Sequence, residues 1–388
     1  MSKLDRDIDN FLAIIHDLAS EAVEWISRPA WVEFSPNNYC NLKCVMCSHS
    51  DDLPLLVMPT NEARRILEQV LPSASLLTPS AGSEPMFGPM RLLLELCRTN
   101  DVYLNMVTNA TALDGVKLRA MADRIQKLWI SFDSHIAEVY ERIRPPAHFD
   151  DVVRNIREIL AVAAELLIPI GFVVVLMAEN ASHLPEYIDF LADIGGDRAG
   201  AEVRVQRMID ISSRCASLDV RARFSEGELL EILQRASARA AARGIILHCD
   251  LPEPLGGITA PVAPRVRGVS GDNLIRIIRT IKERYPHFCN MASYYIKIDP
   301  DGTVFPCCRA PQELVMGNAF KTPIAEIWNG ENYKALRAKM QAREYPRCCQ
   351  NCDVLVSNPH FERGTTSNMG DRPEAPGTSA PCGGAAPK

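Results

Sequence analysis

Short apolar segments alternate with amphipathic segments through the first half of the chain. Segments rich in β-branched and aromatic residues predict buried strands, and apolar positions at helical spacing between them predict helices. Strands are expected at 31–34, 75–78, 102–107, 127–132, 168–177 and 202–208, with helices at 60–72, 89–99, 114–122, 149–166 and 183–193. Strands separated by helices imply a parallel sheet with right-handed crossovers. An open twisted sheet and a partial barrel fit this pattern equally.

The segments on either side of this repeat have other patterns. Residues 1–28 carry apolar positions at helical spacing and predict one amphipathic helix that ends before Pro29. Beyond residue 210 the chain predicts a helix at 225–243, a strand at 245–248, a Pro/Gly-rich loop at 251–269, helices at 272–284 and 323–341, and a hairpin at 294–305 around an Asp-Pro-Asp-Gly turn. The last residues are rich in Gly, Pro, Ala and Ser, which predicts a disordered tail.

Composition narrows the class of protein. The 388 residues are 47% hydrophobic and 23% charged, which suits a large buried core and excludes a disordered protein or a coiled coil. The net charge of -6 gives no reason to expect a nucleic-acid or anionic-membrane partner. Residues 1–10 have no signal-peptide pattern, and the apolar run 160–178 is interrupted by charged and helix-breaking residues, so we expect a cytoplasmic protein without a membrane span.

Thirteen cysteines are the unusual feature of the composition. In a reducing compartment, grouped cysteines bind metals or catalyse more often than they form disulfides. Cys97, Cys215, Cys249 and Cys382 stand alone, and the first three predict small buried side chains. The others form two sets, namely Cys40, Cys44 and Cys47, and Cys289, Cys307, Cys308, Cys348, Cys349 and Cys352. This division predicts two metal sites in two domains.

The first set follows the first predicted strand directly. Three thiolates on one loop can hold three corners of a metal cluster and leave the fourth corner open to a ligand. A structural zinc site is the alternative, for which His49 is the only nearby candidate for a fourth ligand.

The Cys-x3-Cys-x2-Cys spacing after the first strand of a β/α repeat resembles the signature of the radical S-adenosylmethionine (SAM) enzymes. The resemblance implies that Cys40, Cys44 and Cys47 bind a [4Fe-4S] cluster whose fourth iron is chelated by SAM. It also implies SAM contacts near the ends of the next strands, at Gly82, Ser83 and Glu84 of a Gly-Ser-Glu-Pro stretch, and at Asn109, Ser131, Asp133 and Arg144. Ser83 stands where the family motif has its second glycine. The fold implied is α/β, a partial (β/α)6 TIM-type barrel, where ligands bind at the carboxyl ends of the strands.

The second set resembles the SPASM/twitch auxiliary-cluster domains. The resemblance implies that Cys289, Cys307, Cys349 and Cys352 hold an auxiliary [4Fe-4S] cluster with no open corner. A full SPASM domain continues with further cysteines, whereas only Cys382 follows here, so the shorter twitch form with one auxiliary cluster is expected.

Cys308 and Cys348 are possible extra thiol ligands, since each adjoins a predicted ligand. One cysteine of each pair could simply pack beside the site. Alternatively, the Arg-Cys-Cys-x-x-Cys stretch that begins at Arg347 resembles that of the arsinothricin-biosynthesis radical SAM proteins, which transfer an aminocarboxypropyl group from SAM to arsenite. Three neighbouring thiolates suit a thiophilic centre such as trivalent arsenic.

These features predict five parts in the chain: an N-terminal helix at 1–29, a radical SAM core at 30–225, a helical and loop linker at 226–284, a small α+β SPASM/twitch domain at 285–362, and a disordered tail at 363–388. By resemblance, the protein would use SAM and its clusters for radical oxidation or bond formation on a small molecule in natural-product biosynthesis, with flavodoxin or ferredoxin as reductant. Gln206 and Arg207 are candidates for the substrate pocket. The alternatives are aminocarboxypropyl transfer to arsenite, a radical SAM peptide maturase, and a non-catalytic iron-sulfur or zinc scaffold.

Overall fold

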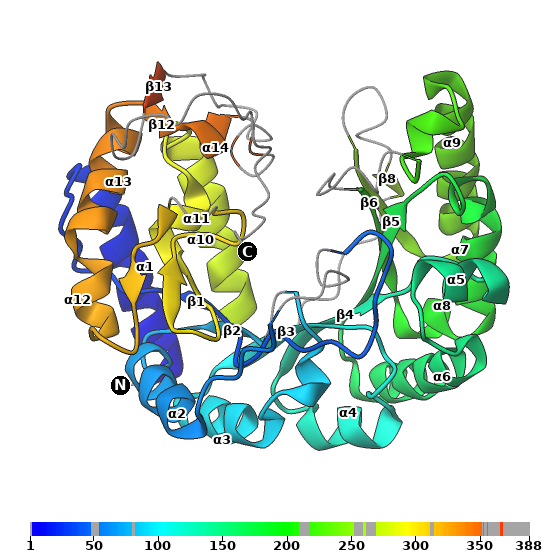
Figure 1. Ribbon diagram of the computed structural model, residues 1–388, viewed down its shortest axis with the longest axis horizontal. Coiled ribbons are helices and arrows are strands. Elements are labelled where there is room, and N and C mark those ends of the chain that lie inside the picture. The colour runs from blue at the N-terminus through cyan, green and yellow to red at the C-terminus, as the bar shows by residue number, and fades with distance from the viewer. Residues whose placement is uncertain are drawn as a thin grey trace.

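A curved sheet with helices on its outer side runs through the protein (Figure 1). This computed structural model describes residues 2–47, 54–79, 82–208, 217–251, 259–260, 269–310, 314–350, 352, 355 and 365–367. His49, Cys215 and Cys382, which the sequence analysis singled out, lie outside the described residues.

The strands of the first half pair in parallel and in chain order, as the sequence pattern predicts. They are β1 (Trp31–Phe34), β2 (Leu76–Pro79), β3 (Tyr103–Thr108), β4 (Ile125–Ser131), β5 (Ile170–Leu176) and β6 (Glu202–Arg207). The sheet continues beyond β6 with the parallel strand β7 (Ile246–Asp250) and the short antiparallel strand β8 (Thr259–Ala260).

The C-terminal hairpin extends the same sheet from its other edge. Strand β9 (Tyr295–Ile298) pairs in parallel with β1, and it is followed by the antiparallel strands β10 (Thr303–Phe305) and β11 (Gly317–Asn318). The strand order places β11 and β8 at opposite ends of the sheet, so the barrel is partial, as predicted. The fold class is α/β, with a small C-terminal α+β domain joined to the barrel.

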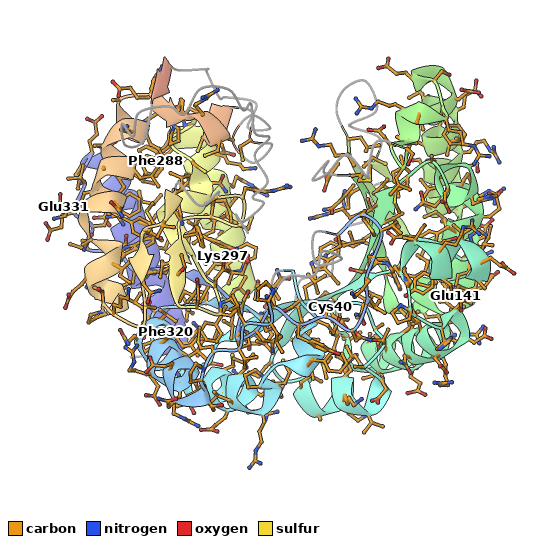
Figure 2. All side chains as sticks on the ribbon, in the orientation of Figure 1. Cys40, Glu141, Phe288, Lys297, Phe320 and Glu331 are labelled. Carbon is orange, nitrogen blue, oxygen red and sulfur yellow. The ribbon has the colours of Figure 1, made fainter. Side chains whose placement is uncertain are left out.

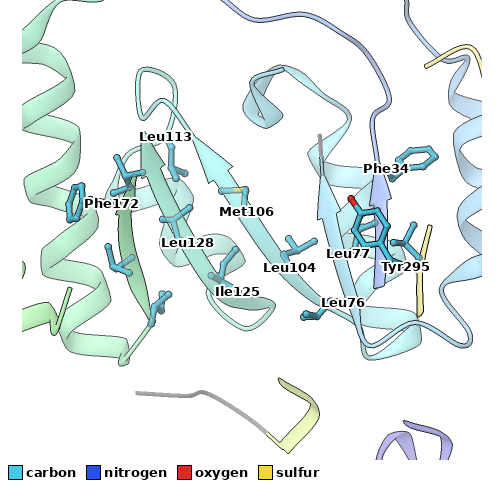
Figure 3. Packing of buried hydrophobic residues seen from close by; sticks show 14 of the residues in the cluster. Phe34, Leu76, Leu77, Leu104, Met106, Leu113, Ile125, Leu128, Phe172 and Tyr295 are labelled. Carbon is cyan, nitrogen blue, oxygen red and sulfur yellow. The ribbon is translucent and has the colours of Figure 1, made fainter. Parts of the chain in front are cut away.

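Helices cover the outer face of the parallel strands (Figure 1). They are α2 (Thr60–Val70), α3 (Met90–Asn100), α4 (Gly115–Met121), α5 (Ala137–Ile143), α6 (Phe149–Leu166), α7 (Leu184–Asp193), α8 (Gly196–Ala199) and α9 (Glu226–Arg243), with 3-10 turns at Pro85–Phe87, Ala181–His183 and Val220–Ala222. Alternate strand residues such as Leu104, Met106 and Leu128 are fully buried between sheet and helices (Figure 3). Each such side chain contributes roughly 1.5–3 kcal/mol to stability.

The remaining elements surround the C-terminal hairpin. They are α1 (Lys3–Ala19), α10 (Val269–Arg284), α11 (Asn290–Tyr294), α12 (Ile324–Trp328), α13 (Glu331–Gln341) and α14 (Arg347–Gln350), with β12 (Glu344–Pro346) paired to β13 (Thr365–Ser367). Strand β13 falls within the range predicted as a tail, and α9 and β7 fall within the predicted linker. Among the described residues, no helix combines the length and the hydropathy needed to cross a bilayer.

Two predicted helices differ from those observed. The N-terminal helix ends at Ala19 instead of residue 28, because Ser20 caps it and Glu21 turns the backbone to a φ of 52°. The predicted helix at 323–341 is broken into α12 and α13. Asn329 ends α12, and Gly330 adopts an extended conformation, with a φ of -74° and a ψ of 166°, before α13 begins.

Candidate active site

The first cysteine loop is fastened to the chain that leaves α5. The backbone N–H of Lys43 donates to the Pro145 carbonyl at 2.6 Å, and that of Val45 donates to the Ile143 carbonyl at 3.0 Å. Figure 2 labels Cys40 near the middle of the molecule, between the β9–β11 side and the β5–β8 side. The loop therefore has a fixed position over the inner part of the barrel.

The structure brings together the three thiols that the sequence analysis grouped. Burial is the main cause that raises the pKa of Cys44 to about 11, and the nearby thiols of Cys47 and Cys40 add to the effect. Burial also raises the pKa of Cys40. Its Sγ accepts the backbone N–H of Leu42 at 3.4 Å and the amide of Asn109 at 3.7 Å. Such N–H···S contacts are a usual way for a protein to stabilise a cluster-bound sulfur.

Arg144 lies against this loop in a buried ion pair. Its Nε donates to Asp133 Oδ2 at 2.6 Å, and a terminal nitrogen of the guanidinium lies 3.6 Å from the sulfur of Cys44. The other carboxylate oxygen of Asp133 accepts the backbone N–H of Val175 at 2.8 Å. One oxygen of Asp133 thus holds Arg144, the other anchors Asp133 to β5, and the cation lies beside the Cys44 sulfur.

Glu84 is a second buried carboxylate that, like Asp133, holds a neighbouring group in place beside the loop. Its carboxylate accepts hydrogen bonds from Thr108 Oγ1 at 2.7 Å and from the backbone N–H of Asn109 at 2.8 Å. Burial nevertheless raises its pKa above the ordinary value. This carboxylate joins the turn after β2 to the end of β3, and it positions the Asn109 amide beside Cys40.

The turn that contains Ser83 is explained by its contacts. Gly82 adopts a φ of 108°, which favours glycine. Ser83 Oγ donates to the Asn37 carbonyl at 3.1 Å, and the Glu84 backbone N–H donates to the Tyr39 carbonyl at 3.0 Å. Serine is therefore accommodated where the family motif has glycine. Ser131, which ends β4, is half-buried. The SAM contacts of these residues stay predictions.

The second cysteine set surrounds a cavity. Its lining includes Cys289, Cys307, Cys308, Cys349 and Cys352, together with Met and Leu side chains from α11 and α13. The cavity is partly open to solvent. In the described residues, no three or more His, Cys, Asp or Glu side chains are arranged to hold a single metal ion.

This cavity has one thiol more than a four-cysteine cluster requires. Cys308 lines it beside the four predicted ligands, and Cys348 Sγ lies 4.0 Å from Cys349 Sγ. Burial raises the pKa of Cys289 to about 11, whereas Cys308 is exposed to solvent. A soft, thiol-rich and largely apolar pocket of this kind fits an iron-sulfur cluster, as does the first loop with its three thiols, N–H···S contacts and neighbouring cation.

Two predictions on the barrel wall are refined. Gln206 and Arg207 are consecutive on β6 and therefore project to opposite faces, so only one of them can face the barrel interior. Gln206 shares its face with Arg204, which stacks on Trp129 at 4.6 Å. Glu33, a buried acid on β1, was not among the predicted site residues; the available signal was a single carboxylate within an apolar strand.

Comparisons with known proteins agree with this arrangement. Residues 34–198 match the Radical SAM superfamily model, and residues 289–353 match the SPASM iron-sulfur cluster-binding domain model. The chain is 22% identical over 303 residues to a PqqA peptide cyclase of Gluconobacter oxydans, a match that covers 75% of this chain and 74% of the relative. It is 28% identical over 172 residues to a probable GTP 3',8-cyclase of Methanopyrus kandleri, covering 42% and 53% of the two chains.

Solved structures show the same fold. Streptococcus suis SuiB aligns with a TM-score of 0.61 at 14% identity, covering 92% of this chain and 80% of SuiB. The anSMEcpe structure with bound AdoMet aligns with a TM-score of 0.56 at 15% identity, covering 87% and 93%. Other structures contain SuiB with a precursor peptide and anSMEcpe with a peptide.

A partial barrel with three clustered thiols after its first strand, joined to a small thiol-lined domain, defines the class of radical SAM enzymes with an auxiliary iron-sulfur domain. The chain belongs to the radical SAM superfamily and carries a C-terminal domain of the SPASM/twitch type. It is therefore an enzyme, which excludes the non-catalytic scaffold. Its cofactors are SAM, the [4Fe-4S] cluster that binds SAM, and an auxiliary iron-sulfur cluster.

Proposed function

We propose that this enzyme cleaves SAM reductively beside Cys40, Cys44 and Cys47 and uses the resulting radical to oxidise, or to form a bond in, a small molecule. One observation carries the proposal: β1, which leads into the first cysteine loop, is hydrogen-bonded to β9, which belongs to the hairpin of the second cysteine set. The two sites therefore share one sheet, and a substrate on its inner face lies between them.

The chain's own residues would position the cofactors. When bound, the cluster and SAM supply one-electron chemistry that activates an unreactive carbon–hydrogen bond. Cys40, Cys44 and Cys47 would hold three irons, and Cys289, Cys307, Cys349 and Cys352 would hold the auxiliary cluster. Arg144 would place a fixed positive charge beside Cys44, where it offsets the negative charge of thiolates in a low-dielectric site. The turn at Gly82, Ser83 and Glu84 and the ends of β3 and β4, with Asn109, Ser131 and Asp133, would line the SAM site.

A peptide substrate is the alternative that the relatives favour. One relative is a PqqA peptide cyclase, and SuiB and anSMEcpe have been crystallised with peptides. Small-molecule and peptide substrates are distinguished by incubating the reconstituted enzyme with candidate compounds of both kinds and following deuterium transfer from labelled substrate into 5′-deoxyadenosine.

The surplus thiols favour a second candidate function. Cys308, Cys348 and Cys349 lie at or beside one cavity. Vicinal thiolates suit trivalent arsenic, and transfer of the aminocarboxypropyl group of SAM to arsenite would use them. This reaction breaks a different carbon–sulfur bond of SAM, so its by-product is methylthioadenosine instead of 5′-deoxyadenosine.

The nucleoside product decides between these reactions. The protein is reconstituted anaerobically and supplied with SAM and dithionite, with and without arsenite. The main proposal predicts 5′-deoxyadenosine, and methylthioadenosine formed only with arsenite supports the second candidate. Cys44→Ala should abolish cleavage in both cases, and retained cleavage would refute the assignment of the first site. A cytoplasmic location and a flavodoxin or ferredoxin reductant belong to the same proposal.

A further inference from the structure

Glu33 is a buried carboxylate on the strand that links the two cysteine sites. Its neighbours Val32 and Phe34 are fully buried on the helix side of β1, so Glu33, which alternates with them, lies on the inner face. In the sheet register it stands beside Thr78 of β2 and Lys297 of β9. Only 3% of its surface is exposed.

The two carboxylate oxygens of Glu33 differ in their contacts. Oε2 accepts a hydrogen bond from the hydroxyl of Tyr295. Oε1 is buried and makes no hydrogen bond with any residue that the structure describes. A buried charged oxygen without a partner is costly, and protonation of the carboxylate removes that cost.

The charged and titratable groups around Glu33 come from the C-terminal hairpin. Lys297 attracts the carboxylate, but its ammonium is already paired with Asp299 at 3.1 Å, and Asp299 repels Glu33. Burial is the largest effect and raises the pKa of Glu33 to about 7. From beyond β10, Cys308 is within electrostatic range, because the charge of Glu33 contributes, after burial, to the raised pKa of that thiol. Thr78 on the β2 side is uncharged.

We propose that Glu33, which lies between the two cysteine sites, is a proton acceptor. Its Oε1 takes up a proton when reduction adds negative charge to the auxiliary cluster site. One electron enters the cluster from the reductant, one proton enters from solvent, and the only new bond is the O–H bond on Glu33. A negative charge added nearby raises the affinity of a carboxylate for protons. The inference rests on the proposed function, because it places the auxiliary cluster in the cavity that Cys308 lines.

The midpoint potential of the auxiliary cluster tests this proposal without a substrate. In the Cys40→Ala/Cys44→Ala/Cys47→Ala variant only the auxiliary cluster remains, and its potential is measured by dithionite titration with electron paramagnetic resonance at several pH values. The potential should fall as the pH rises through and above neutrality, by up to about 59 mV for each tenfold change in proton concentration. Adding Glu33→Gln should make the potential independent of pH in this range.

Asp299→Asn is the matched control, since it removes the neighbouring carboxylate and leaves Glu33 in place. The slope should persist but move to lower pH, because the lost negative charge no longer raises the pKa of Glu33. This shift tests the proposal even if Glu33→Gln does not assemble its cluster. A potential that does not depend on pH, or a slope that survives Glu33→Gln unchanged, overturns this inference and leaves the proposed function intact. A triple variant that binds no iron overturns the proposed function as well.

Discussion

At the scale of single residues, the candidate active site depends on carboxylates that hold other groups in place. Asp133 and Glu84 have both oxygens engaged within the protein, and through these bonds Arg144 meets Cys44 and Asn109 meets Cys40. The sequence motifs identified these positions but did not indicate which carboxylate holds which partner. The pairing depends on hydrogen bonds between residues far apart in the chain.

Arg144→Lys should fold and yet lose SAM cleavage by at least about tenfold, because an ammonium cannot bond Asp133 and reach Cys44 at the same time in the way that a planar guanidinium does. Arg142→Lys is the matched control, as Arg142 is exposed and pairs with Glu179 at the surface. Cleavage of SAM is followed by chromatography of the nucleoside products. Equal activity in the two variants would contradict the role given to Arg144.

Glu33 should make the stability of the protein depend on pH. Its pKa is raised from 4.5 to about 7 on folding, so the folded state binds the proton more tightly and stability is lost as pH rises through this interval. The loss amounts to about 3 kcal/mol at most. Glu33→Gln should therefore raise the melting temperature of the reconstituted protein more at pH 8 than at pH 5, and an equal effect at both would contradict the burial argument.

At the scale of elements, the β/α alternation of the barrel was predictable from the sequence, whereas the joining of the C-terminal hairpin to the barrel sheet was not. Periodicity predicted β1 to β6 within two residues or so at each end, because each strand is apolar on its buried face and each helix has one apolar stripe. The parallel pairing of β1 with β9 was not predictable. The two strands are separated by the whole barrel, and their pairing depends on tertiary packing.

Gly171 on β5 tests how tightly the inner face of the sheet is packed. A Cβ there would lie 2.3 Å from the ring of Trp129 on the neighbouring strand. Gly171→Ala should destabilise the protein by roughly 1–3 kcal/mol, as expected for overpacking. Gly227→Ala on α9 meets no atom within 4 Å and should instead stabilise by roughly 0.5–1 kcal/mol. Thermal unfolding of both variants checks the contrast; similar shifts would contradict it.

Arg337 on α13 connects the auxiliary domain to the N-terminal segment. Its guanidinium stacks on Trp25 at 4.1 Å and on Trp328 at 4.8 Å, and it donates to the Val23 carbonyl at 2.9 Å. Arg337→Met should cost no more than about 2 kcal/mol, because the lost cation–π contacts are partly offset by removal of two buried guanidinium nitrogens that have no hydrogen-bond partner among the described residues. It should lower auxiliary-cluster occupancy, because the adjacent Leu336 lines the thiol cavity. Lys334→Met, which loses only a surface ion pair, should change neither quantity in unfolding and iron assays.

At the scale of the whole molecule, a single sheet carries two cysteine sites along its length. The cysteine spacing predicted both sets. The structure adds that the two sites flank one inner face of the sheet, that Cys308 lines the second site, and that Glu33 lies on the strand that links the two sites. The linear order of the cysteines could not show this. The sites are brought together by the pairing of strands from opposite ends of the chain.

The iron content of separate cysteine variants tests the two-site account most directly. After anaerobic reconstitution, the wild-type protein should bind about eight irons, as expected for two [4Fe-4S] clusters. The Cys40→Ala/Cys44→Ala/Cys47→Ala variant and the Cys289→Ala/Cys307→Ala variant should each keep about four, and only the second should keep cluster-dependent SAM binding. Loss of all iron in either variant, or a wild-type content of about four, would contradict the account.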